Sequence, residues 1–204
     1  MASILWRRVD RVGMERAIIE STPDGFRLAG AVLLAEADGP IEIRYSVLTD
    51  RNWQTRTVGA HVQTATGDRR LALNSDGAGT WSAGDDPVLE LYGAIDVDLA
   101  WTPATKTLAI RRLNLDVGES AEAATVGIAF PAHEIERRTH HYERLAPMRY
   151  RYRSGDFETD LTVNDQGLVV AYPGGWTPES ESGHGLGRHR DVCCLPRHSP
   201  LRRN

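Results

Sequence analysis

The run DVDLAWTPATKTLAIRR, residues 96–112, holds the densest group of side chains that could do chemistry. Its two carboxylates, Asp96 and Asp98, are two residues apart and would share one face of a strand. They could act as a general acid and base if their neighbours moved their pKa values apart. Alternatively, they pair with arginines on an adjacent strand and organise the sheet, as acids on strands commonly do.

A second group lies in DRNWQTR, residues 50–56, which we expect to end one strand and begin the next. Trp53 offers a flat apolar face and Arg56 a fork of donors, so the two could bind a sugar or a phosphate. The alternative is a core tryptophan with an arginine packed over it. The two groups together supply the candidate ligand-binding residues, which are Trp53, Arg56, Asp96, Asp98, Thr105, Arg111 and Arg112.

Motifs for metals, nucleotides and hydrolysis are not evident. His140 and His141 are adjacent, and the end of the chain combines histidines with Cys193 and Cys194, but the spacing matches no established zinc pattern. DGAGTW, residues 76–81, lacks the spacing of a nucleotide-binding loop and is interpreted as a turn. No serine lies in a GxSxG turn. We therefore expect no metal, no cofactor and no catalytic residue.

The elements that must position these residues show the two-residue period of β-strands. In IEIRYSVLTD apolar and polar side chains alternate, so Ile43 and Tyr45 fall on one face. FETDLTV and LVVAYP flank a turn that contains Gly167, which predicts a hairpin. In RYRYR tyrosines alternate with arginines, and we interpret the arginine face as solvated.

The remaining segments give weaker signals. VLELYGAIDVDLA, residues 88–100, continues the strand pattern, with a bend or a close backbone approach expected at Gly93. Helical signal is thin, and the best candidate is Gly118–Thr125, GESAEAAT.

Composition limits the class of protein. The 204 residues carry a formal charge of -4, so no nucleic-acid partner is expected. Of the 24 basic residues only Lys106 is a lysine, a skew that we attribute to a GC-rich coding sequence. Charged residues interrupt the N-terminus, and no stretch reaches the roughly 20 apolar residues that span a bilayer. We expect a cytoplasmic protein without a transmembrane segment.

The composition changes after Trp176. Residues 177–204 are rich in Ser, Gly, Pro, Arg and His and lack apolar periodicity. Such a segment cannot bury enough surface to offset its ordering entropy. We expect a single domain over residues 1–176 and a low-complexity, disordered tail over residues 177–204.

Four blocks in order, YSVLTDRNWQTR, DGAGTW, DVDLAWTPATKTLAIRRL and GLVVAYPGGW, resemble the putative glycolipid-binding family of bacteria. The resemblance covers roughly Leu5 to Trp176, and the chain departs from the family pattern at Lys106 and Ala109. It implies an all-β fold, in which a many-stranded antiparallel sheet curls into a spiral β-roll or half-barrel around one helix. It also implies a homodimer, and it brings no catalytic residues.

Three functional hypotheses follow. The first is non-catalytic carriage of a glycolipid or another long-chain acyl amphiphile, since burying each methylene is worth about 0.8 kcal/mol; its alternative is a roll filled by its own side chains. The second is a small enzyme that acts on a sugar or nucleotide through residues 96–112. The third is a dimeric scaffold without a ligand.

Overall fold

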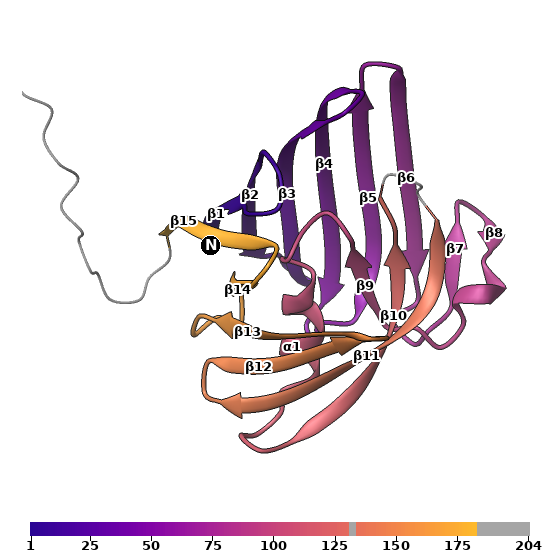
Figure 1. Ribbon diagram of the computed structural model, residues 1–204. Helices are drawn as coiled ribbons and strands as arrows, with labels where there is room; N and C mark the ends of the chain where they lie inside the picture. Colours follow the sequence, from indigo (N-terminus) through magenta and orange to yellow (C-terminus); the bar gives the residue numbers. More distant parts are fainter. Residues whose placement is uncertain (131–133, 183–204) are drawn as a thin grey trace, which may run out of the picture.

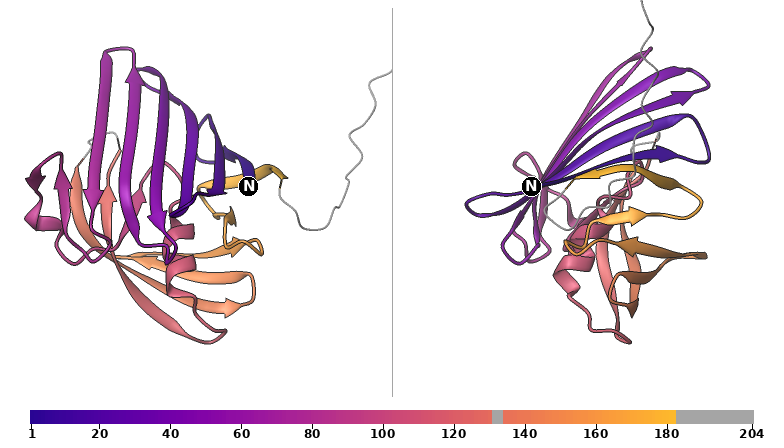
Figure 2. Two further views of the ribbon diagram at one scale, coloured as in Figure 1. Left: turned by 180° about the vertical axis from the view of Figure 1, so that it is seen from behind. Right: turned by 90° about the vertical axis from the view of Figure 1, so that its left-hand side faces the viewer.

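The computed structural model describes residues 1–130 and 134–182. Strands dominate these residues and form two sheets. Figure 1 shows one sheet above the other, and the right-hand view of Figure 2 shows the two sheets diverging from a common side. Sheet A has nine strands, in the spatial order β15 (Trp176–Ser182), β1 (Ala2–Arg8), β2 (Gly13–Ser21), β3 (Gly25–Glu36), β4 (Gly39–Asp50), β5 (Thr55–Thr64), β6 (Gly67–Ser75), β7 (Trp81–Ala83) and β8 (Asp86–Pro87). Sheet B has six, in the order β14 (Val169–Ala171), β13 (Phe157–Val163), β12 (Arg149–Ser154), β11 (Ile135–Ala146), β10 (Ser120–Ile128) and β9 (Asp96–Leu99).

Sheet A is a series of antiparallel hairpins from β1 to β8, with neighbours in the chain also neighbours in the sheet. The alternation predicted for β4 is confirmed, because Ile43 and Tyr45 are buried and Arg44 between them is exposed. β15 returns from the far end of the sequence and pairs with β1, which places Arg8 opposite Trp176. This pairing covers the edge of the N-terminal strand.

The expected start of the tail at residue 177 falls inside a strand. Residues 177–182 belong to β15, and Ser182 lies opposite Ser3 of β1. Backbone hydrogen bonds to β1 stabilise this polar segment, and composition alone does not reveal such pairing. The rest of the expected tail, residues 183–204, lies outside the described residues.

Sheet B is antiparallel except for β9 and β10, which run parallel. The predicted hairpin is confirmed, since β13 and β14 pair across a turn in which Gly167 has a φ of 74°. Tyr150 and Tyr152 of β12 are buried, as the alternation with arginines predicts.

The single α-helix of the described residues is α1, at Lys106–Leu113, and the prediction of a helix at Gly118–Thr125 is wrong. The left-handed conformation of Asn114, with a φ of 45°, ends α1. Most of the segment predicted as helix forms β10, where Ala123 is fully buried. Pairing with strands on both sides outweighs the modest helix propensity of its alanines.

The continuous strand expected over residues 88–100 is also interrupted. Leu89–Leu91 forms a 3-10 helix, η1, and β9 begins only at Asp96. The close approach expected at Gly93 is present, because its N–H donates a hydrogen bond of 2.9 Å to the carbonyl of Gly79.

Two clusters of buried apolar side chains meet at α1. Leu108 belongs to the cluster along the inner face of sheet A, with Trp6 and Trp101. Ala109 and Ile110 belong to the cluster of sheet B. The predicted fold class is therefore confirmed as all-β, with curled sheets and one helix, although the strands divide into two sheets.

Candidate ligand-binding site between the sheets

A cavity of about 410 Å³ lies where both sheets and α1 meet, and we call it the inter-sheet cavity. Known ligand pockets have roughly 300–1,000 Å³ and combine apolar walls with a few convergent polar groups. Its lining comes from β1, β9, β11, β12, β13 and α1, and from the turn between β14 and β15. The lining residues are Arg8, Asp98, Leu99, Ala100, Thr102, Pro103, Lys106, Arg138, Tyr152, Ser154, Phe157, Tyr172, Pro173, Gly174, Gly175 and Trp176.

Asp98 and Lys106 form a buried ion pair in the cavity wall, through Oδ1 of the carboxylate and Nζ of the lysine. The hydroxyl of Thr105 donates a further hydrogen bond of 3.1 Å to the same carboxylate oxygen. Burial alone would raise the pKa of Asp98, but the charge of Lys106, together with His140 and the hydrogen bonds from Lys106 and Thr105, holds that pKa below its ordinary value. The ammonium of Lys106 also lies 4.7 Å from the centre of the Tyr152 ring.

His140 lies behind this ion pair and is 1% exposed. Its Nε2 is 3.7 Å from Oδ2 of Asp98, and neither ring nitrogen has a hydrogen-bond partner among the described residues. Burial lowers the pKa of His140 to about 4, so the imidazole is neutral at pH 7.

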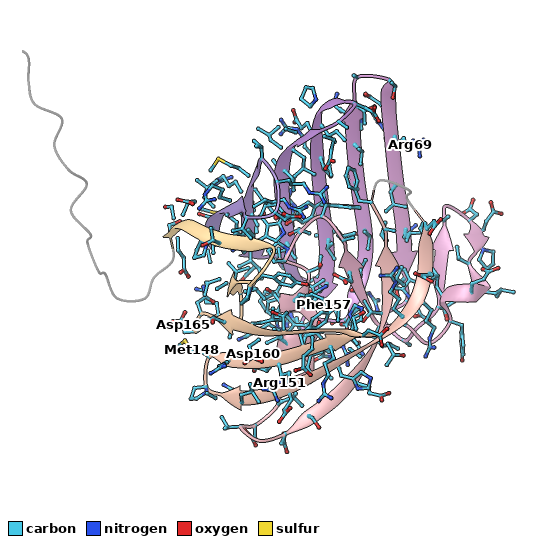
Figure 3. The ribbon with its side chains drawn as sticks, in the orientation of Figure 1. Arg69, Met148, Arg151, Phe157, Asp160 and Asp165 are labelled. Carbon is cyan, nitrogen blue, oxygen red and sulfur yellow. The ribbon has the colours of Figure 1, made fainter. Side chains whose placement is uncertain are left out.

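Aromatic side chains form another part of the wall. The rings of Phe157 and Tyr172 are nearly parallel, with centres 6.1 Å apart. Phe157 is 47% exposed and lies between the two sheets in Figure 3. The guanidinium of Arg8 lies over the ring of Trp176, 5.0 Å from the ring centre. The cavity therefore has a flat apolar side next to charged groups.

Arg8 and Arg138 bring two further cations to the cavity. Arg8 is held by Asp10 through two hydrogen bonds of 2.8 and 2.7 Å. Arg138 pairs with Glu136 on its own strand, and Gly127 leaves the room that its side chain occupies. Neither acid lines the cavity.

Glu15 lies next to the cavity on the inner face of β2 and is fully buried. Its Oε1 accepts hydrogen bonds of 2.5 Å from the Tyr45 hydroxyl and 2.7 Å from the Thr102 hydroxyl, and Thr102 itself lines the cavity. Oε2 has no partner among the described residues. Burial raises the pKa of Glu15 to about 8, so the carboxyl is mostly protonated at pH 7.

Asp96 and Arg112 form a second ion pair between β9 and α1, next to that of Asp98 and Lys106. The guanidinium donates hydrogen bonds of 2.9 and 2.7 Å to the two carboxylate oxygens of Asp96, which is 1% exposed. Burial raises the pKa of Asp96, and Arg112 partly offsets this. The two acids of the DVDL motif thus face basic residues, as one sequence hypothesis held, but those partners lie on the helix.

Trp53 and Arg111 meet at a separate hollow of about 250 Å³. The indole of Trp53 stacks on Phe26 with ring centres 3.9 Å apart, and Arg111 covers it at 5.1 Å. Trp53 is only 8% exposed, so it is a core tryptophan with an arginine packed over it. That arginine is Arg111 rather than the expected Arg56.

Arg56 lies apart from both sites. Its guanidinium donates a hydrogen bond to the carbonyl of Asp76, in the turn before β7, and lies 4.0 Å from the carboxylate of Asp50. The structure therefore divides the sequence-predicted residues. Asp98 lines the inter-sheet cavity, and Thr105 contacts it only through its hydrogen bond to Asp98. Asp96 and Arg112 form their own ion pair, and Trp53 and Arg111 line the second hollow.

Sequence reasoning missed most of the cavity. Lys106 carried a usable signal, since the one lysine among 23 arginines is a buried partner of Asp98. Glu15 carried another, because it occupies an inward position in an alternating strand. Arg8, Phe157 and Tyr172 carried none, because only the folded topology brings them together.

Two further observations concern metals and membranes. Among residues 1–130 and 134–182, no group of three or more His, Cys, Asp or Glu side chains is placed to hold a metal ion. In the same residues, no helix has the length and apolar character needed to cross a bilayer. The cysteines and histidines of residues 183–204 lie outside the described part of the chain.

The fold and the cavity define an all-β protein of two sheets packed around one helix. The chain belongs to the family described as "Putative glycolipid-binding", whose model matches residues 3–177. It is similar to a protein of the DUF1089 family from Pseudomonas aeruginosa, known from a crystal structure at 1.80 Å resolution. The two share 32% sequence identity with a TM-score of 0.72, over 79% of this chain and 89% of that one. No curated protein matches the chain.

Proposed function

We propose that this protein binds an amphiphile without catalysis and that the inter-sheet cavity receives the polar head group. The observation that supports this proposal is the lining of that cavity, where Lys106 and Asp98 lie close to the parallel rings of Phe157 and Tyr172. A sugar ring or a glycerol backbone has apolar C–H faces that pack on aromatic rings, and its polar groups bind charged side chains. The membership of the putative glycolipid-binding family supports the same kind of ligand.

The protein interior leaves little room for the apolar part of the ligand. Large side chains of the protein itself, including Trp6, Trp81 and Trp101, fill the inner face of sheet A. We therefore place the acyl chain along the exposed side of Phe157, at the rim of the cavity. Each methylene removed from water there would contribute about 0.8 kcal/mol.

The proposal gives different roles to the sequence-predicted residues. Asp98 and Thr105 would fix the orientation of Lys106 toward the head group. Asp96 and Arg112 would hold α1 on β9, since both oxygens of Asp96 are already engaged. Because Asp96 is buried and does not line the cavity, we assign it no role as an acid or base on a substrate.

A binding titration tests the proposal. Delipidated protein would be titrated with a fluorescent single-chain lipid, and the Phe157→Ala variant would be compared with Tyr92→Ala. Both aromatic side chains are exposed, by 47% and 72%, but only Phe157 lines the cavity. We expect saturable binding that Phe157→Ala weakens about tenfold and Tyr92→Ala leaves unchanged. Absence of uptake, or equal effects of the two variants, would contradict the proposal.

We also propose that the protein is a homodimer, which the family resemblance supports. Several apolar side chains are exposed near one end of sheet A, among them Val12 and Leu33 at 77% and 59%. Light scattering during size-exclusion chromatography measures the assembly directly. A mass of one chain at micromolar concentration would overturn this part of the proposal.

A further inference from the structure

We infer that the inter-sheet cavity selects an anionic head group, a phosphate or a carboxylate, over a neutral sugar. This inference rests on the proposed function and specifies its ligand class. The observation that supports it is the set of charged side chains that line the cavity.

The charged residues of the cavity lining are three cations, Arg8, Lys106 and Arg138, and one acid, Asp98. Oδ1 of Asp98 is already occupied by Lys106 and Thr105. Arg8 and Arg138 have their acidic partners, Asp10 and Glu136, outside the lining, so the charged groups that face the cavity are mainly hydrogen-bond donors. A bound anion would accept hydrogen bonds from these donors.

The neighbouring acids add no charged acceptor to the lining. Glu15 is mostly uncharged at pH 7, because burial raises its pKa to about 8. Asp10 and Glu136 pair with Arg8 and Arg138 but do not line the cavity. An arginine has five N–H donors, so each of these two can keep its carboxylate and still bind an oxyanion.

The three cations differ in how firmly they are placed. Arg8 is fixed between Asp10 and the ring of Trp176, and its side chain is only 13% exposed. Lys106 is fixed by Asp98, with 7% exposure. Arg138 and its partner Glu136 are exposed by 40% and 55%, so their ion pair is weak and readily rearranged. Arg138 is therefore the cation that can turn toward an arriving ligand.

A neutral sugar fits this lining less well. Sugar hydroxyls need both donors and acceptors, whereas arginine and lysine side chains only donate. The carboxylate of Asp98 is the one charged acceptor of the lining, and it is engaged with Lys106 and Thr105. A phosphate or carboxylate oxygen accepts from all three cations and needs no acceptor from the protein.

The experiment compares octyl phosphate with octyl glucoside, two ligands with one chain length and different head groups. Calorimetric titration of the delipidated full-length chain, below the micellar concentration of both, gives the two affinities. We expect octyl phosphate to bind at least about tenfold more tightly. We also expect Arg138→Gln to weaken octyl phosphate binding more than octyl glucoside binding and so to reduce that preference.

Arg27→Gln is the matched control, because Arg27 is also 40% exposed and pairs with an acid, Glu20, outside the inter-sheet cavity. It should change neither affinity. Equal binding of the two ligands, or equal effects of the two arginine variants, would overturn the anion inference and leave the proposed function standing. Binding of neither ligand would overturn the proposed function itself. Inorganic phosphate, added as competitor, separates the two sources of the anion, since equal affinity for it would assign the site to free phosphate.

Discussion

The hydroxyl of Tyr45 on β4 reaches across β3 and donates a hydrogen bond of 2.5 Å to Glu15 on β2. The intervening strand allows this because its residue opposite Tyr45 is Gly30. A Cβ at Gly30 would lie 2.6 Å from the ring atoms and the hydroxyl oxygen of Tyr45. A glycine in the middle of a strand thus provides the space for a buried polar network beside the inter-sheet cavity.

Gly30→Ala should destabilise the protein by about 2 kcal/mol, because the added methyl group displaces the Tyr45 ring from Glu15. Gly59→Ala is the matched control on the same sheet, where the nearest atom to a new Cβ lies 4.0 Å away. Urea unfolding followed by tryptophan fluorescence gives both free energies. A loss at Gly30 no larger than that at Gly59 would contradict the packing argument.

Glu15 should make the protein less stable as the pH rises. Burial raises its pKa from 4.5 to about 8, so the folded chain holds a proton that the unfolded chain releases. The stability from this group is fully present below pH 4.5, declines between pH 4.5 and 8, and levels off above. Glu15→Gln should flatten this decline in a series of unfolding curves, whereas Glu90→Gln, at an exposed position, should not. An unchanged slope in Glu15→Gln would show that the carboxyl is ionised in the fold.

His140 should make the protein less stable as the pH falls. Burial lowers its pKa from 6.5 to about 4, so its contribution to stability is present above pH 6.5 and is lost as the pH falls toward 4. His140→Leu should make the unfolding free energy less dependent on pH in that window. His141→Leu is the control, since the adjacent imidazole is 50% exposed. Identical pH profiles for the wild type and His140→Leu would refute this assignment.

Breaking the pair of Lys106 and Asp98 should be costly, because removal of either residue leaves the other charge buried and unpaired. Lys106→Met leaves a buried carboxylate without its cation and should cost about 3 kcal/mol or more. Adding Asp98→Asn removes the stranded charge, so the double variant should recover much of that loss. A double-mutant cycle from denaturant unfolding measures the coupling, and additive losses would argue against a direct interaction.

The sequence predicts the strands well, because each needs only local alternation and a turn to specify it. β4, the β13–β14 hairpin and the buried tyrosines of β12 follow from this pattern alone. The helix does not, since α1 has eight residues and depends on burial of Leu108 and Ile110 against two different clusters. Neither cluster can be inferred from the segment itself.

The site is less predictable than the fold for a related reason. Asp98 was recognisable as a candidate, but its partner lies on a helix that the sequence did not indicate. Arg8 and Trp176 come from opposite ends of the chain and meet only because β15 pairs with β1. Such long-range pairing leaves no local signal, so the aromatic and cationic wall becomes visible only in the folded protein.

Native mass spectrometry of the purified protein, followed by organic extraction, tests amphiphile binding most directly. We expect a stoichiometric adduct whose extract contains an acyl-bearing molecule with an anionic head group. A protein that carries no adduct, and takes none up after incubation with total lipid extract, would contradict it.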